Sequence, residues 1–262
     1  MDLAAWPAAG QAQGGGGPAL ATITIDRQER RNAQTPHMWL ALADIRRSLP
    51  GSVRVVVIRA EGAWFSPGLD LQGLAPEGIA GAPSFPEMAR MPDDEADALI
   101  AAYQAGFDWS HDPAYVSVAA VQGHAVGAGF QLALGCDLRV LADDAQLTMA
   151  ETGHGIVPDL GGTKPLVQAV GYARALEICA TGRRVAAAEA AELGIAQLVV
   201  RRDELDAAVA DLAAALLAAP ADAVRETKAL LLGAAMRTYA EQCGAERDAQ
   251  VRRLRDLAGL GE

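Results

Sequence analysis

Hydrophobic residues follow two patterns along the chain: short runs rich in β-branched residues, and longer segments in which apolar residues recur at helical spacing. The first pattern predicts strands and the second predicts amphipathic helices. Strands are predicted at residues 19–26, 53–59, 115–121, 137–142 and 196–200. Helices are predicted at residues 35–48, 93–110, 127–134, 203–219 and 221–256. This alternation predicts an α/β core followed by a helical appendage.

Several residues mark where these elements begin and end. Thr35 followed by Pro36 is typical of a helix N-terminus, with Thr35 as the capping residue. The run at 53–59 is almost entirely apolar, which favours a strand buried on both faces. Residues 1–18 and 72–92 are both rich in Gly, Pro and Ala. We interpret residues 1–18 as a mobile tail or hairpin loop and residues 72–92 as a mobile loop that covers another part of the protein.

Composition and charge narrow the classes of protein. The formal net charge is −11 and the basic residues form no cluster larger than short pairs such as Arg30-Arg31, so nucleic acid is not expected as a partner. The three cysteines, Cys136, Cys179 and Cys243, are far apart, which favours buried small side chains over disulfides or a zinc site. The sequence has neither a signal-peptide pattern nor an apolar run of membrane-spanning length, so a soluble, cytoplasmic protein is expected.

One pattern occurs twice in the predicted core: a buried strand, a glycine-containing loop and a helix start. It comprises RVVVIRAEGAWFSPGLDL (54–71) and YVSVAAVQGHAVGAGFQLAL (115–134). A helix N-terminus exposes unpaired N–H groups, and two converging termini could share one oxygen atom as an oxyanion hole. Taken locally, these segments are equally compatible with tight turns that bind nothing.

The chain resembles the crotonase (enoyl-CoA hydratase/isomerase) family over about residues 21–200. Five segments carry the resemblance through their order and spacing: RRNAQ (30–34), GAWFSPGLDL (62–71), VQGHAVGAGFQLALGCDLRV (121–140), ETGHGIVPDLGGTK (151–164) and AAAEAAELGIAQLVV (186–200). The resemblance implies an α/β fold made of a crotonase-like spiral of ββα turns, with a C-terminal helical trimerisation region. The implied organisation is a flexible segment at 1–18, a spiral core with the acyl-CoA site at 19–200 and an oligomerisation region at 201–262.

The resemblance also implies which groups contact the substrate, an acyl-CoA thioester. In the family two backbone N–H groups hold the thioester oxygen, and the matching positions are Leu69 and Ala128. Pro67 lacks an N–H, but it precedes the first donor by two residues and does not remove it. Six further residues are expected to bind substrate: Arg31, Ala33, Ser66, Gly68, Asp70 and Gly127.

The catalytic side chains depart from the pattern of an efficient hydratase. Hydratases of the family place two glutamates on a water molecule; the second matches Glu151, but the first position holds Gln131, an amide that orients groups and is no general base. Asp159 matches a position where some members carry a working carboxylate. The predicted catalytic residues are therefore Glu151, Asp159 and Gln131. The alternatives are that Glu151 pairs with a nearby arginine and that Asp159 caps the following helix.

One carboxylate that removes a proton and returns it to another carbon suffices to move a double bond, whereas hydration must also add water. The leading hypothesis is therefore an enoyl-CoA isomerase that stabilises a thioester enolate. The alternatives are a weak enoyl-CoA hydratase and a non-catalytic acyl-CoA-binding protein.

The expected partners and cofactors follow from the same resemblance. A homotrimer or a dimer of trimers is expected, with no metal and no cofactor, since coenzyme A is part of the substrate. Candidates to hold the CoA phosphates are Arg30, Arg31 and Lys164, with Arg252 and Arg253 supplied by a neighbouring subunit.

Overall fold

Two β-sheets form the centre of the molecule. The computed structural model describes residues 3–4 and 19–261. The larger sheet has the order β1-β2-β3-β4-β6-β9, from β1 (Leu3–Ala4), β2 (Leu20–Ile25), β3 (Val55–Ala60), β4 (Val116–Val121), β6 (Leu138–Ala142) and β9 (Leu198–Val200). β1 is antiparallel to β2 and all other neighbours are parallel. The smaller sheet has the order β5-β7-β8, from β5 (His124–Val126), β7 (Gln146–Thr148) and β8 (Arg184–Ala186).

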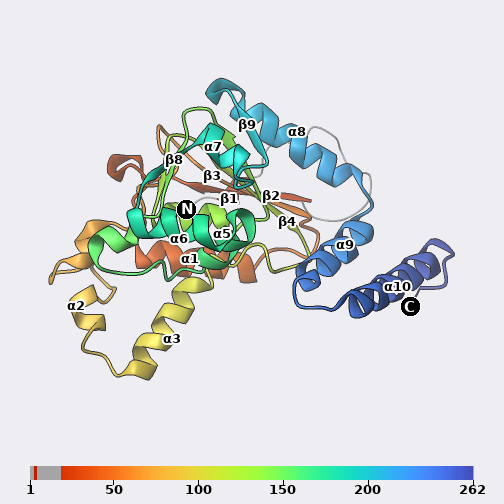
Figure 1. The fold of residues 1–262 in the computed structure, drawn as a ribbon, viewed down its shortest axis with the longest axis horizontal. Helices are drawn as coiled ribbons and strands as arrows, with labels where there is room; N and C mark the ends of the chain where they lie inside the picture. The colour runs from red at the N-terminus through yellow and green to blue at the C-terminus, as the bar shows by residue number, and fades with distance from the viewer. Residues whose placement is uncertain (1–2, 5–18, 262) are drawn as a thin grey trace.

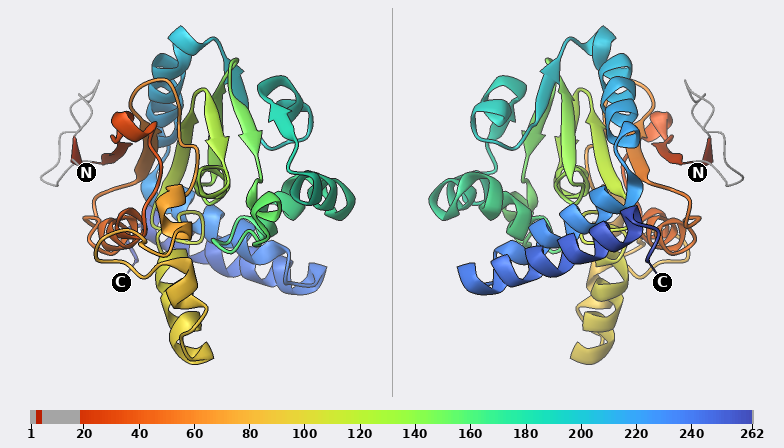
Figure 2. Two further views of the ribbon diagram at one scale, coloured as in Figure 1. Left: turned by 90° about the vertical axis from the view of Figure 1, so that its left-hand side faces the viewer. Right: turned by 90° about the vertical axis from the view of Figure 1, so that its right-hand side faces the viewer.

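Helices surround the sheets and continue beyond them at the C-terminus (Figure 1). The α-helices are α1 (Pro36–Arg47), α2 (Phe85–Met88), α3 (Asp93–Gln104), α4 (Ala128–Leu134), α5 (Thr163–Val170), α6 (Tyr172–Thr181), α7 (Ala187–Glu192), α8 (Leu205–Ala218), α9 (Ala221–Ala234) and α10 (Tyr239–Leu257). The 3₁₀ turns are η1 (Gln28–Arg30), η2 (Leu71–Leu74), η3 (Glu151–His154) and η4 (Arg202–Glu204). α3 projects from one end of the body, and α10 lies against α9 away from the sheets (Figures 1 and 2).

The central strands are buried on both faces, as their largely apolar runs predict. Val55 and Val57 of β3 face α8, where they pack with Val209. Val56 and Ile58, one residue out of step, face the opposite core. Because side chains alternate along a strand, each central strand contributes to both cores. The α/β fold class is therefore confirmed.

The repeated sequence pattern corresponds to stacked turns of the chain. β3 pairs in parallel with β4, and beyond these strands Ser66 pairs with Ala125. Ser66 N–H donates to the His124 carbonyl at 2.9 Å, and Val126 N–H donates to the Ser66 carbonyl at 2.9 Å. The two glycine-containing loops are consequently held side by side by backbone hydrogen bonds.

Most predicted helix ends agree with the structure. Thr35 caps α1 by accepting from Met38 N–H, and Pro36 is the first helical residue. α3 ends at Gln104 and not near residue 110, and Gly106, two residues later, packs so closely on α1 that a β-carbon would lie 2.3 Å from the Trp39 carbonyl oxygen. The expectation for residues 1–18 lies outside the described residues, apart from residues 3–4.

The predictions missed the smaller sheet and one break in a C-terminal helix. β5, β7 and β8 were not predicted, since each is only three residues long and only its central residue is buried. The single helix expected at 221–256 is two helices, α9 and α10. Thr238 and Glu241 form a reciprocal capping box that starts the second helix. The Thr-x-x-Glu spacing was the sequence signal for this break.

Pro220 separates α8 from α9, as predicted, and the axes of the two helices bend by 102°. Within residues 3–4 and 19–261, no single helix combines the length and apolar character of a membrane span. The segments 202–218 and 221–234 meet that test of length and composition only when they are taken together.

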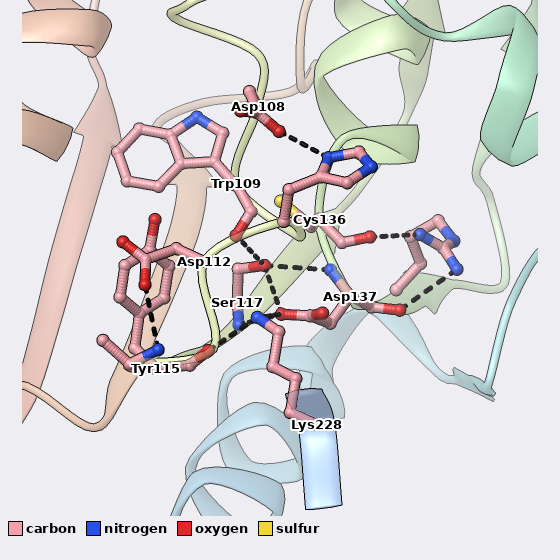
Figure 3. Close-up of polar contacts among 11 residues, drawn as sticks. Asp108, Trp109, Asp112, Tyr115, Ser117, Cys136, Asp137 and Lys228 are labelled. Atoms are coloured by element: carbon pink, nitrogen blue, oxygen red, sulfur yellow. Dashed lines mark hydrogen bonds and ion pairs between the residues drawn. The ribbon is translucent and has the colours of Figure 1, made fainter. Parts of the chain in front are cut away.

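A buried polar cluster attaches α9 to the larger sheet (Figure 3). Lys228 Nζ donates to the Tyr115 carbonyl at 2.7 Å and to Asp137 Oδ2 at 2.8 Å. Asp137 Oδ2 also accepts from the N–H and from the hydroxyl of Ser117, both at 2.7 Å. The Lys228 side chain is only 9% exposed. The Lys228 ammonium and the Asp137 carboxylate therefore neutralise each other, and both are hydrogen-bonded inside the protein.

Replacing Lys228 with methionine is expected to lower the free energy of unfolding by about 3 kcal/mol, because Asp137 would stay buried without its cation. Urea unfolding at fixed protein concentration measures the change. The matched control is Arg252→Met, which breaks an ion pair with Glu226. Because the Arg252 side chain is 56% exposed, this substitution should lower the free energy of unfolding by less than about 1 kcal/mol. Equal losses in the two variants would contradict the assignment.

Candidate active site

A cavity of about 690 Å³, open on one side, lies where the two glycine-containing loops meet. Two backbone stretches, 67–69 and 126–128, contribute to its floor. The other lining residues are Trp39, Leu71, Leu74, Phe85, Met88, Tyr103, Gln131, Ala150, Glu151, His154, Ile156, Asp159 and Leu160. Most of these side chains are apolar, and the polar ones are few, as is usual for a small-molecule site.

Backbone hydrogen bonds fix the first loop. Gln34 N–H donates to the Gly68 carbonyl at 2.7 Å, and Asp70 N–H donates to the Gln34 carbonyl at 2.8 Å. Leu69 lies between these bonds, and its own N–H has no hydrogen-bond partner within the described residues. The Ser66 hydroxyl accepts from Gly68 N–H at 3.1 Å and donates to the Asn32 carbonyl at 2.8 Å. The peptide of Leu69 is thus held rigidly at the cavity wall.

The second loop delivers Ala128 to the start of α4. Gly127 adopts φ 51° and ψ −119°, a conformation open mainly to glycine, and its N–H donates to the Thr148 carbonyl at 2.8 Å. The Ala128 N–H that follows has no acceptor among residues 3–4 and 19–261. A β-carbon on Gly68 would lie 2.5 Å from the Val126 carbonyl oxygen and 3.3 Å from Ala128 N. The two unpaired N–H groups therefore belong to loops in direct contact.

Two N–H donors from adjoining backbone segments can bind one oxygen atom that develops negative charge. Both donors are main-chain groups, so the side chains of Leu69 and Ala128 do not alter this capacity. Alanine at position 128 retains a backbone N–H, and Ala128 remains 5% exposed at the cavity.

If the Leu69 and Ala128 N–H groups together bind a thioester oxygen, as the family resemblance implies, replacing Gly68 with alanine should lower kcat/KM for an enoyl thioester by about tenfold to hundredfold. The new β-carbon would push on the Val126 carbonyl and move the two N–H donors apart, a partial loss of the roughly 10²–10³ that one complete donor supplies. Steady-state kinetics measures the effect. Gly51→Ala is the matched control, because a β-carbon at Gly51 meets no atom within 4 Å. An unchanged rate in the Gly68 variant would argue against the two donors acting together.

Glu151 begins η3 and is the most buried carboxylate on the cavity wall, at 7% exposed. Its Oε1 accepts from Gln131 Nε2 at 2.7 Å, whereas the buried Oε2 has no hydrogen-bond partner among the described residues. Burial raises the pKa of Glu151, and the nearby Asp159 charge raises it further, partly offset by the hydrogen bonds. A carboxylate with one tethered and one unpaired oxygen is suited to accept and return a proton.

Gln131 uses its amide to organise the protein around it. While Nε2 donates to Glu151, Oε1 accepts from the N–H groups of Leu160 at 2.9 Å and Gly162 at 3.2 Å. The side chain is fully buried on α4, with 1% of its surface exposed. Gly162 is required here, since a β-carbon would lie 2.7 Å from Gln131 Cγ. Gln131 thereby joins α4, the Glu151 carboxylate and the segment before α5.

Asp159 precedes Leu160 and also lines the cavity, and burial raises the pKa of Asp159 as well. The helix that follows, α5, has Gly162 as its N-cap and no side-chain cap, so Asp159 does not cap it. The main-chain carbonyl of Asp159 accepts a hydrogen bond from Gln104 Nε2 at 2.7 Å. The other alternative is also unsupported, because Glu151 forms no ion pair with an arginine in the described part of the chain.

A family model described as enoyl-CoA hydratase/isomerase matches residues 15–256. The chain belongs to this family. It is 51% identical to "a putative enoyl-CoA hydratase" from Thermobifida fusca YX in complex with CoA, with a TM-score of 0.87 over 92% of this chain and 91% of the other. A structure of that enzyme in complex with acetoacetyl-CoA gives the same identity and TM-score over 91% and 92% of the two chains. A "Putative enoyl-CoA hydratase/isomerase YngF" from Bacillus subtilis is 34% identical over 80% of this chain and 76% of its own length.

Seven of the residues predicted for this enoyl-CoA hydratase/isomerase family site line one cavity: Gly68, Leu69, Gly127, Ala128, Gln131, Glu151 and Asp159. The other four stand behind the cavity or outside it. Ser66 is completely buried, and its hydroxyl braces the first loop. Asp70 pairs with Arg27 at 2.7 Å and accepts from Gln72 N–H, so its carboxylate positions the chain after Leu69.

The remaining two residues lie on the segment before α1. Arg31 is exposed, with positive φ, and its guanidinium lies 5.0 Å from the centre of the Trp64 ring. The carbonyl of Ala33 accepts from Arg27 at 3.0 Å. Arg30 and Lys164 are exposed, while Arg252 and Arg253 form ion pairs within their own chain.

Sequence reasoning anticipated a covering loop at 72–92 but named none of the residues in the apolar part of the site. Trp39 of α1 and Tyr103 of α3 pack edge to face with ring centres 5.2 Å apart, and both line the cavity. Leu74, Phe85 and Met88 come from the loop at 72–92. The signal was present, because apolar side chains in a Gly- and Pro-rich loop need a surface to pack on, but their target could not be read locally.

Proposed function

We propose that this enzyme is an enoyl-CoA isomerase that moves a double bond within an acyl-CoA thioester. The observation that carries the proposal is the pairing of Glu151 with a neutral amide, Gln131, at 2.7 Å. A hydratase with two glutamates has a second acid or base at that place, which this chain lacks. The unpaired Oε2 of Glu151 leaves one carboxylate oxygen to carry a proton.

The reaction requires one proton to leave and to return. The thioester carbonyl oxygen binds the N–H groups of Leu69 and Ala128, which increases the acidity of the neighbouring α-carbon. The Glu151 carboxylate removes a proton from the α-carbon of a 3-enoyl thioester, and the electron pair spreads over the dienolate. The carboxylic acid then returns the proton to the γ-carbon, which gives the 2-enoyl thioester and restores the carboxylate.

Asp159 acts as an electrostatic partner of Glu151 or as an alternative base. Its charge disfavours ionisation of Glu151 and so raises the pKa of that group, which makes Glu151 a stronger base once ionised. The raised pKa of Asp159 itself follows from burial. No cofactor or metal enters this mechanism, in which the CoA thioester is the substrate.

Weak hydration is the second candidate, and it is favoured by the names of the similar proteins, which include hydratases. In that case Glu151 alone would activate the water. Gln131 is a poor ligand for this water, because its oxygen already accepts two hydrogen bonds and its nitrogen donates to Glu151.

The deciding experiment compares purified enzyme on a 3-enoyl-CoA and on a 2-enoyl-CoA of the same chain length. We expect the 3-enoyl-CoA to be converted to the conjugated 2-enoyl product, which is monitored by its absorbance. Hydration of the 2-enoyl-CoA should be at least about tenfold slower. Faster hydration would favour the hydratase. Tight thioester binding without turnover of either ester would identify a non-catalytic acyl-CoA-binding protein.

We also infer a homotrimer, or a dimer of trimers, assembled through α9 and α10. These helices and the turn between them expose large apolar side chains, among them Leu231 at 69%, Met236 at 83% and Tyr239 at 86%. Apolar surface of this kind on a projecting helix pair is usual for an interface between subunits. Light scattering on the eluted protein tests the inference, and a monomer would contradict it.

A further inference from the structure

A second cavity lies behind the active site and shares one wall with it. Residues 159–162, here called the wall segment, separate the two. Asp159 lines the active-site cavity, Gly161 lines the outer cavity, and Leu160, between them, lines both. Leu160 is 4% exposed and packs in the main hydrophobic core. One apolar side chain therefore stands where the two spaces approach each other.

The backbone of the wall segment is fixed from two sides. Gln131 of α4 holds the N–H groups of Leu160 and Gly162 at 2.9 and 3.2 Å. Gln104, at the end of α3, donates to the Asp159 carbonyl at 2.7 Å. With these three hydrogen bonds the main chain cannot easily move away as a unit, so the size and rotamer of the Leu160 side chain control the passage.

The outer cavity has about 810 Å³ of open space. Its lining residues are Ala101, Gln104, Ala105, Phe107, Asp108, Ser110, His111, Gly135, Leu160, Gly161 and Pro165. The apolar members include Leu160 and Phe107, and the polar members include Asp108 and His111, which are hydrogen-bonded to each other at 2.5 Å. Small or apolar side chains with polar groups among them suit a hydrocarbon chain that passes towards solvent.

We propose that the outer cavity receives the far end of a long acyl chain and that Leu160 is the specificity-determining residue that limits its entry. The inference rests on the proposed thioester function, because the chain is placed by a carbonyl held at Leu69 and Ala128. Short acyl groups end within the first cavity and do not need to displace Leu160. Long chains must displace its side chain, and a smaller residue removes that obstacle.

Calorimetric binding of saturated thioesters tests the proposal without turnover. Acetyl-, octanoyl- and dodecanoyl-CoA are titrated into the wild type and into Leu160→Ala, with Leu160→Val as a milder change should alanine impair folding. The variants should bind dodecanoyl-CoA about tenfold more tightly than the wild type, the gain from burying roughly two further methylene groups. Affinity for acetyl-CoA should stay within about twofold.

Two further variants give the controls. Leu166→Ala removes an equally buried leucine of the next helix, which lines neither cavity, and it should bring no gain. Ala101→Phe, added to Leu160→Ala, places a phenyl group on the lining of the outer cavity and should reduce the gain. An unchanged chain-length profile in the Leu160 variants would overturn the proposal, as would a gain that Ala101→Phe leaves unaltered. If acetyl-CoA fails to bind the wild type, the thioester function itself fails, and the inference with it.

Discussion

Replacing Glu151 with glutamine is expected to lower kcat for isomerisation by about 10³-fold, since the amide cannot remove the α-proton. The amide has nearly the same shape, and its oxygen can keep the 2.7 Å hydrogen bond from Gln131 Nε2. Affinity for the thioester should therefore change by less than about threefold. The measurements are the rate on a 3-enoyl-CoA and a binding titration with a saturated thioester.

Asp159→Asn is the matched control for this substitution. It should retain most of the rate, and it should shift the acidic limb of the pH–rate profile to lower pH. The negative charge of Asp159 raises the pKa of Glu151. Replacing Asp159 with a neutral amide therefore lowers the pKa of Glu151, and the base is ionised at lower pH. If the Asp159 variant loses more activity than the Glu151 variant, the base is Asp159 and the roles must be exchanged.

Replacing Gln131 with glutamate is expected to raise the hydration of a 2-enoyl-CoA by about 10³-fold, the usual range for an added acid–base group. One carboxylate oxygen would stand 2.7 Å from Glu151 Oε1, in the place of Nε2. Two carboxyl groups at this distance share a proton, which gives one acid and one base around a water molecule. The other oxygen would still accept from Leu160 and Gly162 N–H groups.

Gln131→Met separates this chemical effect from a structural one. Methionine fills a similar volume but offers no strong acceptor to the wall segment and no donor to Glu151. It should slow isomerisation and leave hydration at the wild-type level. Should the glutamate variant gain no hydration while it remains folded and binds the thioester, the cavity lacks room for a water molecule near the pair, and the identity of residue 131 does not select the reaction.

Local sequence predicted the parts of the fold that depend on neighbouring residues. The largely apolar run of β3 indicated burial on both faces, because side chains alternate along a strand and both faces of this sheet are covered. Thr35 and Pro36 indicated the start of α1 through capping chemistry alone. The break before α10 was missed although the capping box was present, since the surrounding residues also suit a continuous helix.

The residues of the site were also predicted from sequence only in part. Their order and spacing indicated the family, and with it the positions Leu69, Ala128, Glu151 and Asp159. Ser66 and Asp70 lie in the same motif, yet the structure uses their side chains to brace the loop behind the cavity. A one-dimensional motif records which residues lie near a site, but it does not record which way each side chain points.

The sequence by itself determined the α/β core, the two glycine-containing loops and the replacement of a glutamate by Gln131. Only the tertiary structure decided what that replacement does: the Gln131 amide joins Glu151 to the wall segment, across 20 and about 30 residues of chain. The same holds for Leu160, which separates two cavities built from distant helices and loops. Strand burial and helix capping are local and periodic, whereas these contacts arise when separate turns of the chain pack together.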